Sequence, residues 1–173
     1  MTVWIETGSP APPFSLVDSD GQVYDLAKTL AAAQNRFDES ETRRGGNPVA
    51  VVMYFYPRDD TPGCTKQACG FRDRWSDFQT RGVTVWGVSP DDAESHRKFR
   101  DKFDLPFPLL IDSDHRVATA YGAYREKNMY GKKSMGIVRS TFLIGVDGTV
   151  VKTYKRVRVD GHDEAVLGVI DGA

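Results

Sequence analysis

One segment constrains the fold of this chain more than any other: the eight-residue run Val49–Tyr56, which contains only apolar and aromatic residues. Most of them are β-branched or aromatic, and odd and even positions are equally apolar. That pattern is typical of a strand buried on both faces, in a sheet with parallel neighbours. A bilayer span needs about 20 apolar residues, so the run predicts a central strand and not a membrane helix.

The segments that follow this strand alternate between helix and strand patterns. Between Cys64 and Arg81, apolar residues recur every three or four positions, which fits one face of a helix. Val83–Val88 and Phe107–Ile111 are further apolar runs and are predicted as strands. Because a strand, helix and strand in this order favour a right-handed parallel crossover, the centre of the chain is predicted to be α/β.

The flanking segments complete the expected architecture. Asp-Gly turns predict hairpins at Phe14–Tyr24 and at Ser140–Arg156. Tyr124–Gly136 is polar and is predicted to be a loop. Helices are expected in three further segments: Leu26–Phe37, Asp92–Phe103 and Asp163–Ile170. One or two helical turns are expected at Val117–Tyr121. By analogy, this order of elements fits a thioredoxin-like α/β fold, with a central mixed β-sheet flanked by helices and an N-terminal hairpin.

The length of 173 residues fits one domain of ordinary size, so a single domain over residues 1–173 is expected. The segment 29–47 ends in a polar, glycine-containing stretch and is expected to be a surface insertion. A chain of this length buries enough surface, roughly 70%, to form a core without disulfides or metals. A cysteine pair is therefore free to do chemistry.

The charge balance argues against polyanionic partners. Lys and Arg total 23 and Asp and Glu total 24, which leaves a net charge of −1. No excess positive field attracts nucleic acid or anionic lipid, so neither partner is expected. The N-terminus lacks a basic region followed by an apolar stretch, so a cytoplasmic location is expected. In a reducing cytoplasm, two cysteines serve chemistry more often than structure.

The loop between the central strand and the helix that follows it carries the candidate site. Thr61 and Pro62 fit the N-cap and first positions of a helix, with the Thr61 hydroxyl accepting a hydrogen bond from a helix amide. Cys64 then occupies the third helical position, where unpaired N–H groups and the helix dipole favour a thiolate. The alternative is a small cysteine buried in the core. The polar neighbours Asp59 and Asp60 indicate a solvated loop and favour a nucleophilic Cys64.

Two other kinds of site are disfavoured by spacing. Cys69 lies five residues after Cys64, so the pair is not the Cys-x-x-Cys motif of dithiol exchange. His96, His115 and His162 lie in unrelated segments without metal-ligand spacing, and we expect each to be exposed on the surface. Neither a metal nor another cofactor is predicted.

The motif Pro57-x-x-x-Thr61-x-x-Cys64 resembles the active-site motif of peroxiredoxins. The longer run YFYPRDDTPGCTKQACGFRD is similar to the bacterioferritin comigratory protein, or peroxiredoxin Q, subfamily. The resemblance covers nearly the whole chain, through matches at Ala11–Phe14, Gly87–Asp91, Phe107–Asp112, Gly136–Ile144 and Gly161-His162.

This resemblance implies a thioredoxin-like fold and a thiol peroxidase that reduces hydrogen peroxide and organic hydroperoxides. Cys64 attacks the peroxide O–O bond and becomes a sulfenic acid. Cys69 then resolves it as an intramolecular disulfide, which thioredoxin or a similar dithiol reduces. A monomer is expected.

The resemblance also assigns roles to the residues around the thiol. Thr61 hydrogen-bonds the thiolate or the peroxide, and Pro57 shields the sulfenate from water. The amides of Gly63 and Cys64 polarise the bound peroxide. Arg139 matches an arginine whose charge stabilises the thiolate and the oxygen that becomes negative in the transition state.

Two readings on the same fold remain alternatives: a thiol-disulfide oxidoreductase, and a redox sensor that oxidises without turnover. The insertion 29–47 is longer than the family usually has, so the resemblance does not predict its shape. The basic residues between Arg125 and Lys133 have no assigned role and are expected to be solvated.

Overall fold

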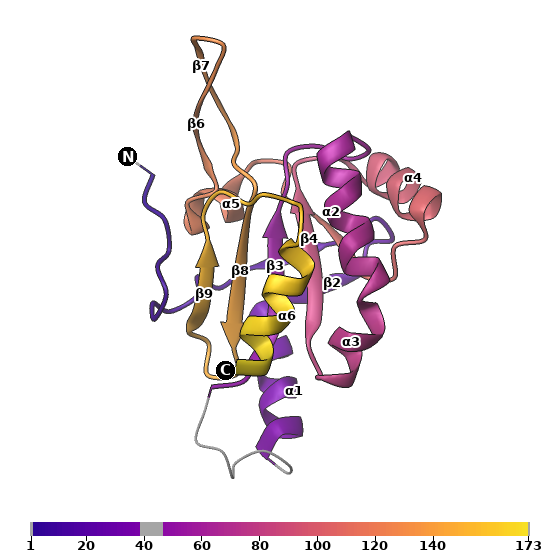
Figure 1. The fold of residues 1–173 in the computed structure, drawn as a ribbon, viewed down its shortest axis with the longest axis vertical. Helices are drawn as coiled ribbons and strands as arrows, with labels where there is room; N and C mark the ends of the chain where they lie inside the picture. The colour runs from indigo at the N-terminus through magenta and orange to yellow at the C-terminus, as the bar shows by residue number, and fades with distance from the viewer. Residues whose placement is uncertain (1, 39–46, 173) are drawn as a thin grey trace.

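A computed structural model describes residues 2–38 and 47–172 of the chain, and a five-stranded mixed sheet forms its centre (Figure 1). Strand β3 lies in the middle and all seven of its residues are buried, as predicted. Only one neighbour, β4, is parallel to it; the other, β8, is antiparallel. In spatial order the strands are β5 (Leu109–Ile111), β4 (Thr84–Ser89), β3 (Val49–Phe55), β8 (Ser140–Gly145) and β9 (Val150–Tyr154).

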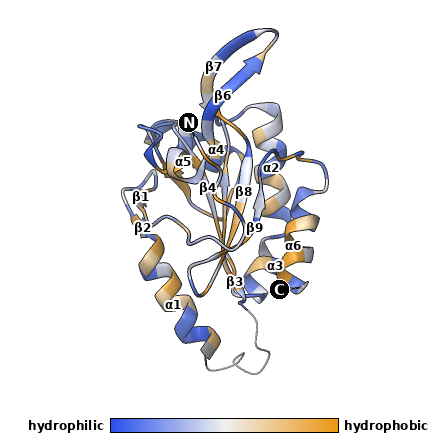
Figure 2. Ribbon diagram, turned by 90° about the vertical axis from the view of Figure 1, so that its left-hand side faces the viewer, coloured by the Kyte–Doolittle hydropathy of each residue, from blue (hydrophilic) through white to orange (hydrophobic). Residues whose placement is uncertain are grey.

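Helices cover both faces of the sheet, which explains why β3 is apolar on both sides (Figure 2). One face carries α2 (Pro62–Asp73), α3 (Trp75–Thr80), α4 (Ala93–Phe103) and α6 (His162–Gly172). The other carries α1 (Leu26–Asp38), α5 (Arg116–Tyr121) and the N-terminal hairpin of β1 (Ser15–Val17) and β2 (Val23–Asp25).

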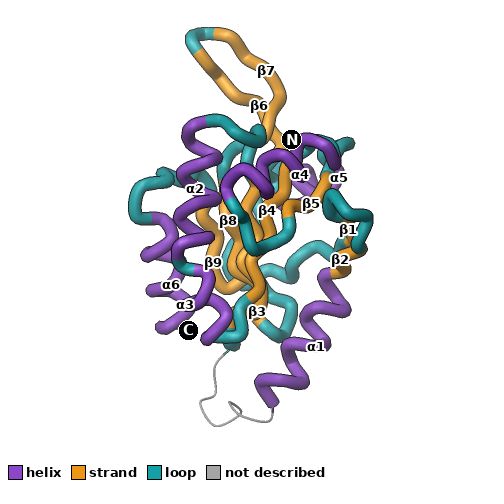
Figure 3. Tube along the Cα trace, turned by 90° about the vertical axis from the view of Figure 1, so that its right-hand side faces the viewer, coloured by secondary structure: helices purple, strands orange, loops and turns teal. Residues whose placement is uncertain are grey.

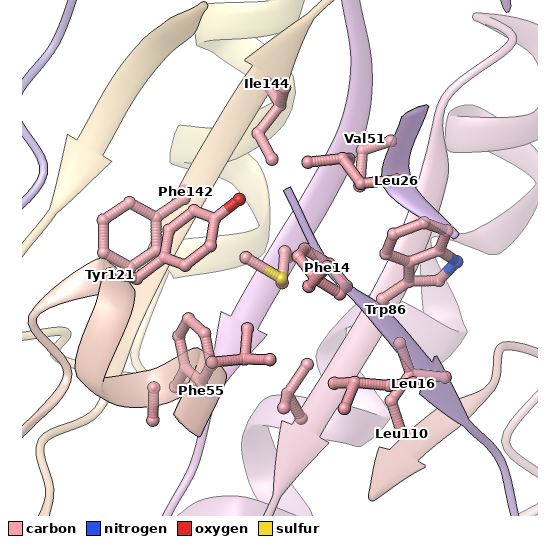
Figure 4. Close-up of a cluster of buried hydrophobic side chains, with 14 of the residues drawn as sticks. Phe14, Leu16, Leu26, Val51, Phe55, Trp86, Leu110, Tyr121, Phe142 and Ile144 are labelled. Carbon is pink, nitrogen blue, oxygen red and sulfur yellow. The ribbon is translucent and has the colours of Figure 1, made fainter. Parts of the chain in front are cut away.

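The alternation of side chains along β3 divides the interior into two hydrophobic clusters. Val51, Met53 and Phe55 face the N-terminal hairpin and α5, in a cluster that includes Trp86 and Phe142 (Figure 4). The intervening residues of β3 face the other way and pack against α2, α4 and α6. These two cores confirm the predicted fold class, a central mixed sheet flanked by helices.

The helix predicted over Cys64–Arg81 is interrupted at Arg74, which has a non-helical backbone (φ −102°, ψ 12°). The Arg74 side chain ion-pairs with Asp163 and Glu164 at the start of α6. Apolar residues keep the helical spacing on both sides of Arg74, so the sequence pattern could not show that the helix is divided there.

The polar segment Tyr124–Gly136 is not the loop that we predicted from its composition. It forms most of a two-stranded hairpin, β6 (Tyr124–Met129) and β7 (Lys132–Ile137), that extends beyond one end of the sheet (Figures 1 and 3). Tyr130 and Gly131 both have positive φ angles, 54° and 80°, as a tight hairpin turn requires. Its strands are polar because most of their residues are exposed, so the usual alternation of apolar residues is missing.

The predicted insertion 29–47 begins as the remainder of α1, which ends at Asp38. Residues 39–46 of that prediction lie outside the described residues. Within residues 2–38 and 47–172, no helix is long and apolar enough to cross a membrane.

Candidate active site

The loop between β3 and α2 places Cys64 in the first turn of α2. Thr61 is the N-cap residue, with an extended backbone (φ −91°, ψ 155°), and Pro62 is the first helical residue. Cys64 is therefore at the third helical position, as predicted. The first-turn amides of α2 surround this position and favour negative charge there.

The Thr61 hydroxyl does not cap the helix, contrary to our prediction. It makes no hydrogen bond to a helix amide and instead donates to the carbonyl oxygen of Arg58 at 3.0 Å. The local carbonyl competes with the helix amides for this hydroxyl. Because its proton goes to Arg58, the Thr61 oxygen keeps lone pairs that can accept hydrogen bonds.

Cys64 is buried, with only 1% of its surface exposed, and packs in the cluster that contains Tyr54, Ala68 and Phe71. The solvated environment predicted from Asp59 and Asp60 is therefore wrong for the sulfur. The loop is polar, but the third helical position turns the thiol towards the sheet. Pro57 and Thr61 are half-buried beside this loop.

Arg139, which directly precedes β8, reaches the sulfur from the neighbouring strand. Its Nη2 lies 3.2 Å from Cys64 Sγ, and its Nη1 donates to Gln67 Oε1 at 2.7 Å. A Cβ atom at Gly63 would lie 3.1 Å from Arg139 Nη2, so a residue without a side chain at position 63 leaves room for the guanidinium. The structure thus brings Gly63, Cys64 and Arg139 together.

The sequence reasoning missed Gln67, which is 3% exposed and orients Arg139. Its spacing of three from Cys64 places both on the same helix face, and that signal could have identified it. Among the described residues, the buried side-chain atoms without a hydrogen-bond partner are Tyr54 Oη, Gln67 Nε2 and Trp86 Nε1. Burial, followed by the charge of Cys64, raises the pKa of Tyr54 well above its ordinary value, so its phenol stays neutral.

Cys69 lies on the same helix but apart from this group. It is partly exposed and lines a cavity of about 430 Å³ between α2 and the start of α6, next to Gly70, His162 and Asp163. Burial raises the pKa of the Cys69 thiol; Arg72 lowers it by a smaller amount and Asp73 raises it. The thiol is therefore protonated at neutral pH. Both cysteines are free, and the helix is continuous between them.

The expectation that all three histidines are exposed is wrong. His96 and His162 are 0% and 5% exposed, whereas His115 is partly buried and stacks on Tyr124. His162 Nε2 lies 2.9 Å from Thr141 Oγ1, and burial lowers its pKa to about 4, so this ring is neutral at pH 7.

His96 also has neighbours that its position in the sequence did not reveal. Its Nδ1 and carboxylate oxygens of Asp59 and Asp91 lie within 4.8 Å of one another. Each of these carboxylate oxygens already accepts hydrogen bonds from protein groups. The grouping is therefore a hydrogen-bonded network in the described structure.

Comparisons with known proteins agree with this architecture. The profile of the AhpC/TSA family matches residues 7–153. The putative peroxiredoxin bcp of Coxiella burnetii is 43% identical over 164 residues, covering 95% of this chain and 97% of the relative. Peroxiredoxin Bcp of Escherichia coli is 37% identical over 163 residues, 94% of each chain.

Solved structures show the same relationship. A cysteine-to-serine mutant of Xylella fastidiosa PrxQ matches with a TM-score of 0.82 and 30% identity over 98% of both chains. Xanthomonas campestris bacterioferritin comigratory protein, studied for its alkyl peroxide reduction activity, matches with a TM-score of 0.78 and 33% identity over 99% of this chain and 98% of that one. The chain therefore belongs to the AhpC/TSA family and is a peroxiredoxin of the bacterioferritin comigratory protein, or peroxiredoxin Q, type, a peroxidase enzyme.

Proposed function

We propose that Cys64 is the residue that reduces the peroxide, and the observation that carries this is the 3.2 Å contact between Cys64 Sγ and Arg139 Nη2 at the N-terminus of α2. The thiolate attacks one oxygen of ROOH, an S–O bond forms and the O–O bond breaks. The leaving RO⁻ takes a proton and departs as an alcohol, or as water for hydrogen peroxide. Sulfur is oxidised to the sulfenic acid and the peroxide is reduced.

Arg139 stabilises negative charge on the sulfur before the attack and on the peroxide oxygen during it. Its permanent charge favours the thiolate before attack, and its N–H groups can follow the charge as it moves onto oxygen. Gln67 holds the guanidinium in place, because its Oε1 accepts a hydrogen bond from Arg139 Nη1 at 2.7 Å. The amides of Gly63 and Cys64, in the unpaired first turn, polarise the bound peroxide.

Thr61 and Pro57 shape the position of the peroxide. The Thr61 oxygen, whose proton is donated to the Arg58 carbonyl, can accept a hydrogen bond from the protonated oxygen of the peroxide. This holds that same protonated oxygen next to the sulfur, so the S–O bond forms to it, the O–O bond breaks and RO⁻ is the leaving group. The half-buried Pro57 ring has no N–H and shields the sulfenate from water.

Cys69 completes the cycle as the resolving thiol. Its sulfur attacks the Cys64 sulfenic acid, a disulfide forms and the sulfenic oxygen leaves as water. Because its pKa is raised, Cys69 stays protonated in the reduced enzyme and does not compete with Cys64 for peroxide. Thioredoxin or a similar dithiol then reduces the disulfide. A monomeric state and a cytoplasmic location remain predictions from the sequence.

Stopped-flow oxidation of the reduced protein, with mass analysis of its products, tests this proposal. Hydrogen peroxide and an alkyl hydroperoxide should each oxidise Cys64 first, and the mass should then fall by one water as the disulfide forms. With thioredoxin, thioredoxin reductase and NADPH present, peroxide consumption should continue for many turnovers. Oxidation without turnover would indicate a redox sensor. Disulfide exchange without peroxide consumption would indicate a thiol-disulfide oxidoreductase.

We expect the disulfide to form only when the start of α2 unwinds. Residues five apart in an intact helix have Cα atoms separated by about 8.6 Å and point about 140° apart, whereas a disulfide needs less than about 7 Å. Amides across Thr61–Phe71 should therefore exchange faster in the oxidised protein, and Trp75 fluorescence offers a second probe.

The amides of α4 are the internal control in that hydrogen-exchange experiment, since nothing in the reaction requires α4 to move. Unwinding should end before Arg74, which the acidic residues of α6 hold. An oxidised protein that contains the Cys64–Cys69 disulfide and keeps full protection over Thr61–Phe71 would overturn this prediction.

A further inference from the structure

A buried carboxylate, Asp59, anchors the loop that leads to the active-site helix. The Asp59 side chain is 3% exposed. Its Oδ1 accepts a hydrogen bond from Tyr56 at 2.6 Å, and its Oδ2 accepts one from Ser95 at 2.8 Å and lies 2.7 Å from His96 Nδ1. Its backbone amide donates to Asp91 Oδ2 at 2.8 Å. We call these residues, with Ser89, the Asp59 network.

Both ring nitrogens of His96 face oxygen acceptors. Nδ1 lies 2.7 Å from the Asp59 carboxylate, and Nε2 lies 3.0 Å from the carbonyl oxygen of Leu110. A neutral imidazole has one donor and one acceptor nitrogen, so it can satisfy only one of these contacts. The other contact would place two acceptors against each other in a fully buried site, which is strongly unfavourable.

A proton on each nitrogen removes this conflict. Imidazole is a stronger base than a carboxylate, so the proton between them belongs on Nδ1. The imidazolium and the carboxylate together carry no net charge, which reduces the cost of burying them. Tyr56 adds no charge, because burial and, to a lesser extent, Asp59 raise the pKa of its phenol well above the ordinary value. The remaining ionisable member, Asp91, accepts hydrogen bonds from Ser89 and the Asp59 amide.

The partners of Asp59 all come from outside α2. They lie directly after β3, in the loop after β4 and in α4. Ser89 at the end of β4 joins through Asp91, and Leu110 of β5 joins through His96. Asp60, the next residue, ion-pairs with Lys102 of α4 at 2.9 Å. When α2 unwinds, none of these contacts has to break. The network can therefore hold the loop through Asp60, so that unwinding starts at Thr61.

We propose that His96, as an imidazolium paired with Asp59, is a positioning residue for the peroxidase reaction: it holds the loop that presents Pro57 and Thr61 to the peroxide. It touches neither the sulfur nor the substrate. This inference rests on the function proposed above, because Pro57 and Thr61 matter here only if peroxide reacts at Cys64.

Nitrogen-15 NMR of the histidine rings tests the protonation state without any activity measurement. At pH 8 an exposed histidine, with a pKa of about 6.5, is neutral. His96 should show two protonated nitrogens at that pH, whereas His162, whose pKa is about 4, provides a neutral ring as reference. A single protonated nitrogen on His96 would overturn the proposed ion pair.

Two variants separate the hydrogen bonds of the network from its charge. In His96→Gln the side-chain amide of glutamine can still donate a hydrogen bond to the Leu110 carbonyl oxygen. The Asp59 carboxylate, however, loses the hydrogen bond that it accepts from His96 Nδ1. Peroxide oxidation of Cys64 should then slow about 10-fold or more, while alkylation of Cys64 by iodoacetamide stays within about twofold, because Arg139 and the first turn of α2 remain in place. In Asp59→Asn the amide can donate to a neutral His96 ring, so the peroxide rate should stay within a few-fold and His96 should become singly protonated.

Lys98→Gln, at an exposed position of the same helix, is the matched control and should leave both rates unchanged. Equal peroxide rates in His96→Gln and wild type would overturn the positioning role. Equal losses in peroxide and alkylation rates would show general disruption of the fold and would also contradict it. If wild-type Cys64 does not react with peroxide at all, the proposed function fails, while the NMR result still reports on the ion pair.

Discussion

Replacement of Cys64 by serine should abolish peroxide turnover. Serine has nearly the same size and should preserve the fold, but its hydroxyl does not ionise near neutral pH, and its oxygen cannot form the sulfenic acid. The contact with Arg139, 3.2 Å in the wild type, then acts on a neutral group. The measurement is steady-state peroxide consumption with thioredoxin, thioredoxin reductase and NADPH.

Cys69→Ser is the matched control, since it removes the other thiol from the same helix. This variant should still consume one equivalent of peroxide per protein in a single turnover, which leaves Cys64 as the sulfenic acid; oxidation to the sulfinic acid would consume a second equivalent. It should not form the disulfide that thioredoxin reduces. Substantial turnover in Cys64→Ser would assign the nucleophile to another residue.

Replacement of Arg139 by methionine should slow peroxide oxidation of Cys64 by about 10³-fold, the upper end of the range for one transition-state donor. Methionine keeps much of the length of the side chain but removes the charge and both hydrogen bonds, to Cys64 and to Gln67. The sulfur loses its contact with the guanidinium, so alkylation by iodoacetamide at a fixed pH should also be slower than in wild type. Stopped-flow oxidation and the alkylation rate measure the two effects.

Arg158→Met, at an exposed arginine, controls for the loss of one positive charge and should leave both measurements unchanged. Wild-type rates of both alkylation and peroxide oxidation in Arg139→Met would show that the guanidinium does not act on the sulfur. A wild-type alkylation rate combined with slow peroxide oxidation would show that Arg139 acts only in the transition state.

The position of the thiol could be predicted because it follows from local rules. A buried strand, a threonine and a proline at the first helical position together place Cys64 at the third helical position. The direction of the Thr61 hydroxyl could not be predicted in this way. The helix amides and the Arg58 carbonyl compete for it, and the outcome depends on geometry that the residue types do not specify.

The burial of His96 was missed although the sequence contains a signal for it. His96, Phe99 and Phe103 are spaced at three and four residues, and in α4 this face packs on the sheet. A histidine on an apolar face needs buried partners, and those come from strands and loops far along the chain. The spacing therefore predicts burial, but only the tertiary structure identifies Asp59 and Leu110 as the partners.

The hairpin β6–β7 could not be predicted because its sequence contains no clear strand pattern. A strand is recognised in a sequence by alternating apolar residues that form one apolar face, and this hairpin has few such residues because most of its positions are exposed. The Tyr130-Gly131 turn also lacks the asparagine or aspartate that marks most tight hairpins. Its strands are paired by backbone hydrogen bonds, which leave no pattern in the side chains.

The antiparallel placement of β8 beside β3 has a consequence for synthesis of the protein. Arg139, whose guanidinium contacts the Cys64 sulfur, lies 75 residues after Cys64 in the chain. At roughly 5–20 residues per second, a ribosome needs on the order of 4–15 seconds to make that stretch. During this interval the nascent chain contains Cys64 without Arg139. Because Arg139 is proposed to activate the thiol, we expect Cys64 to react weakly with peroxide until the partner strand has been made and has docked.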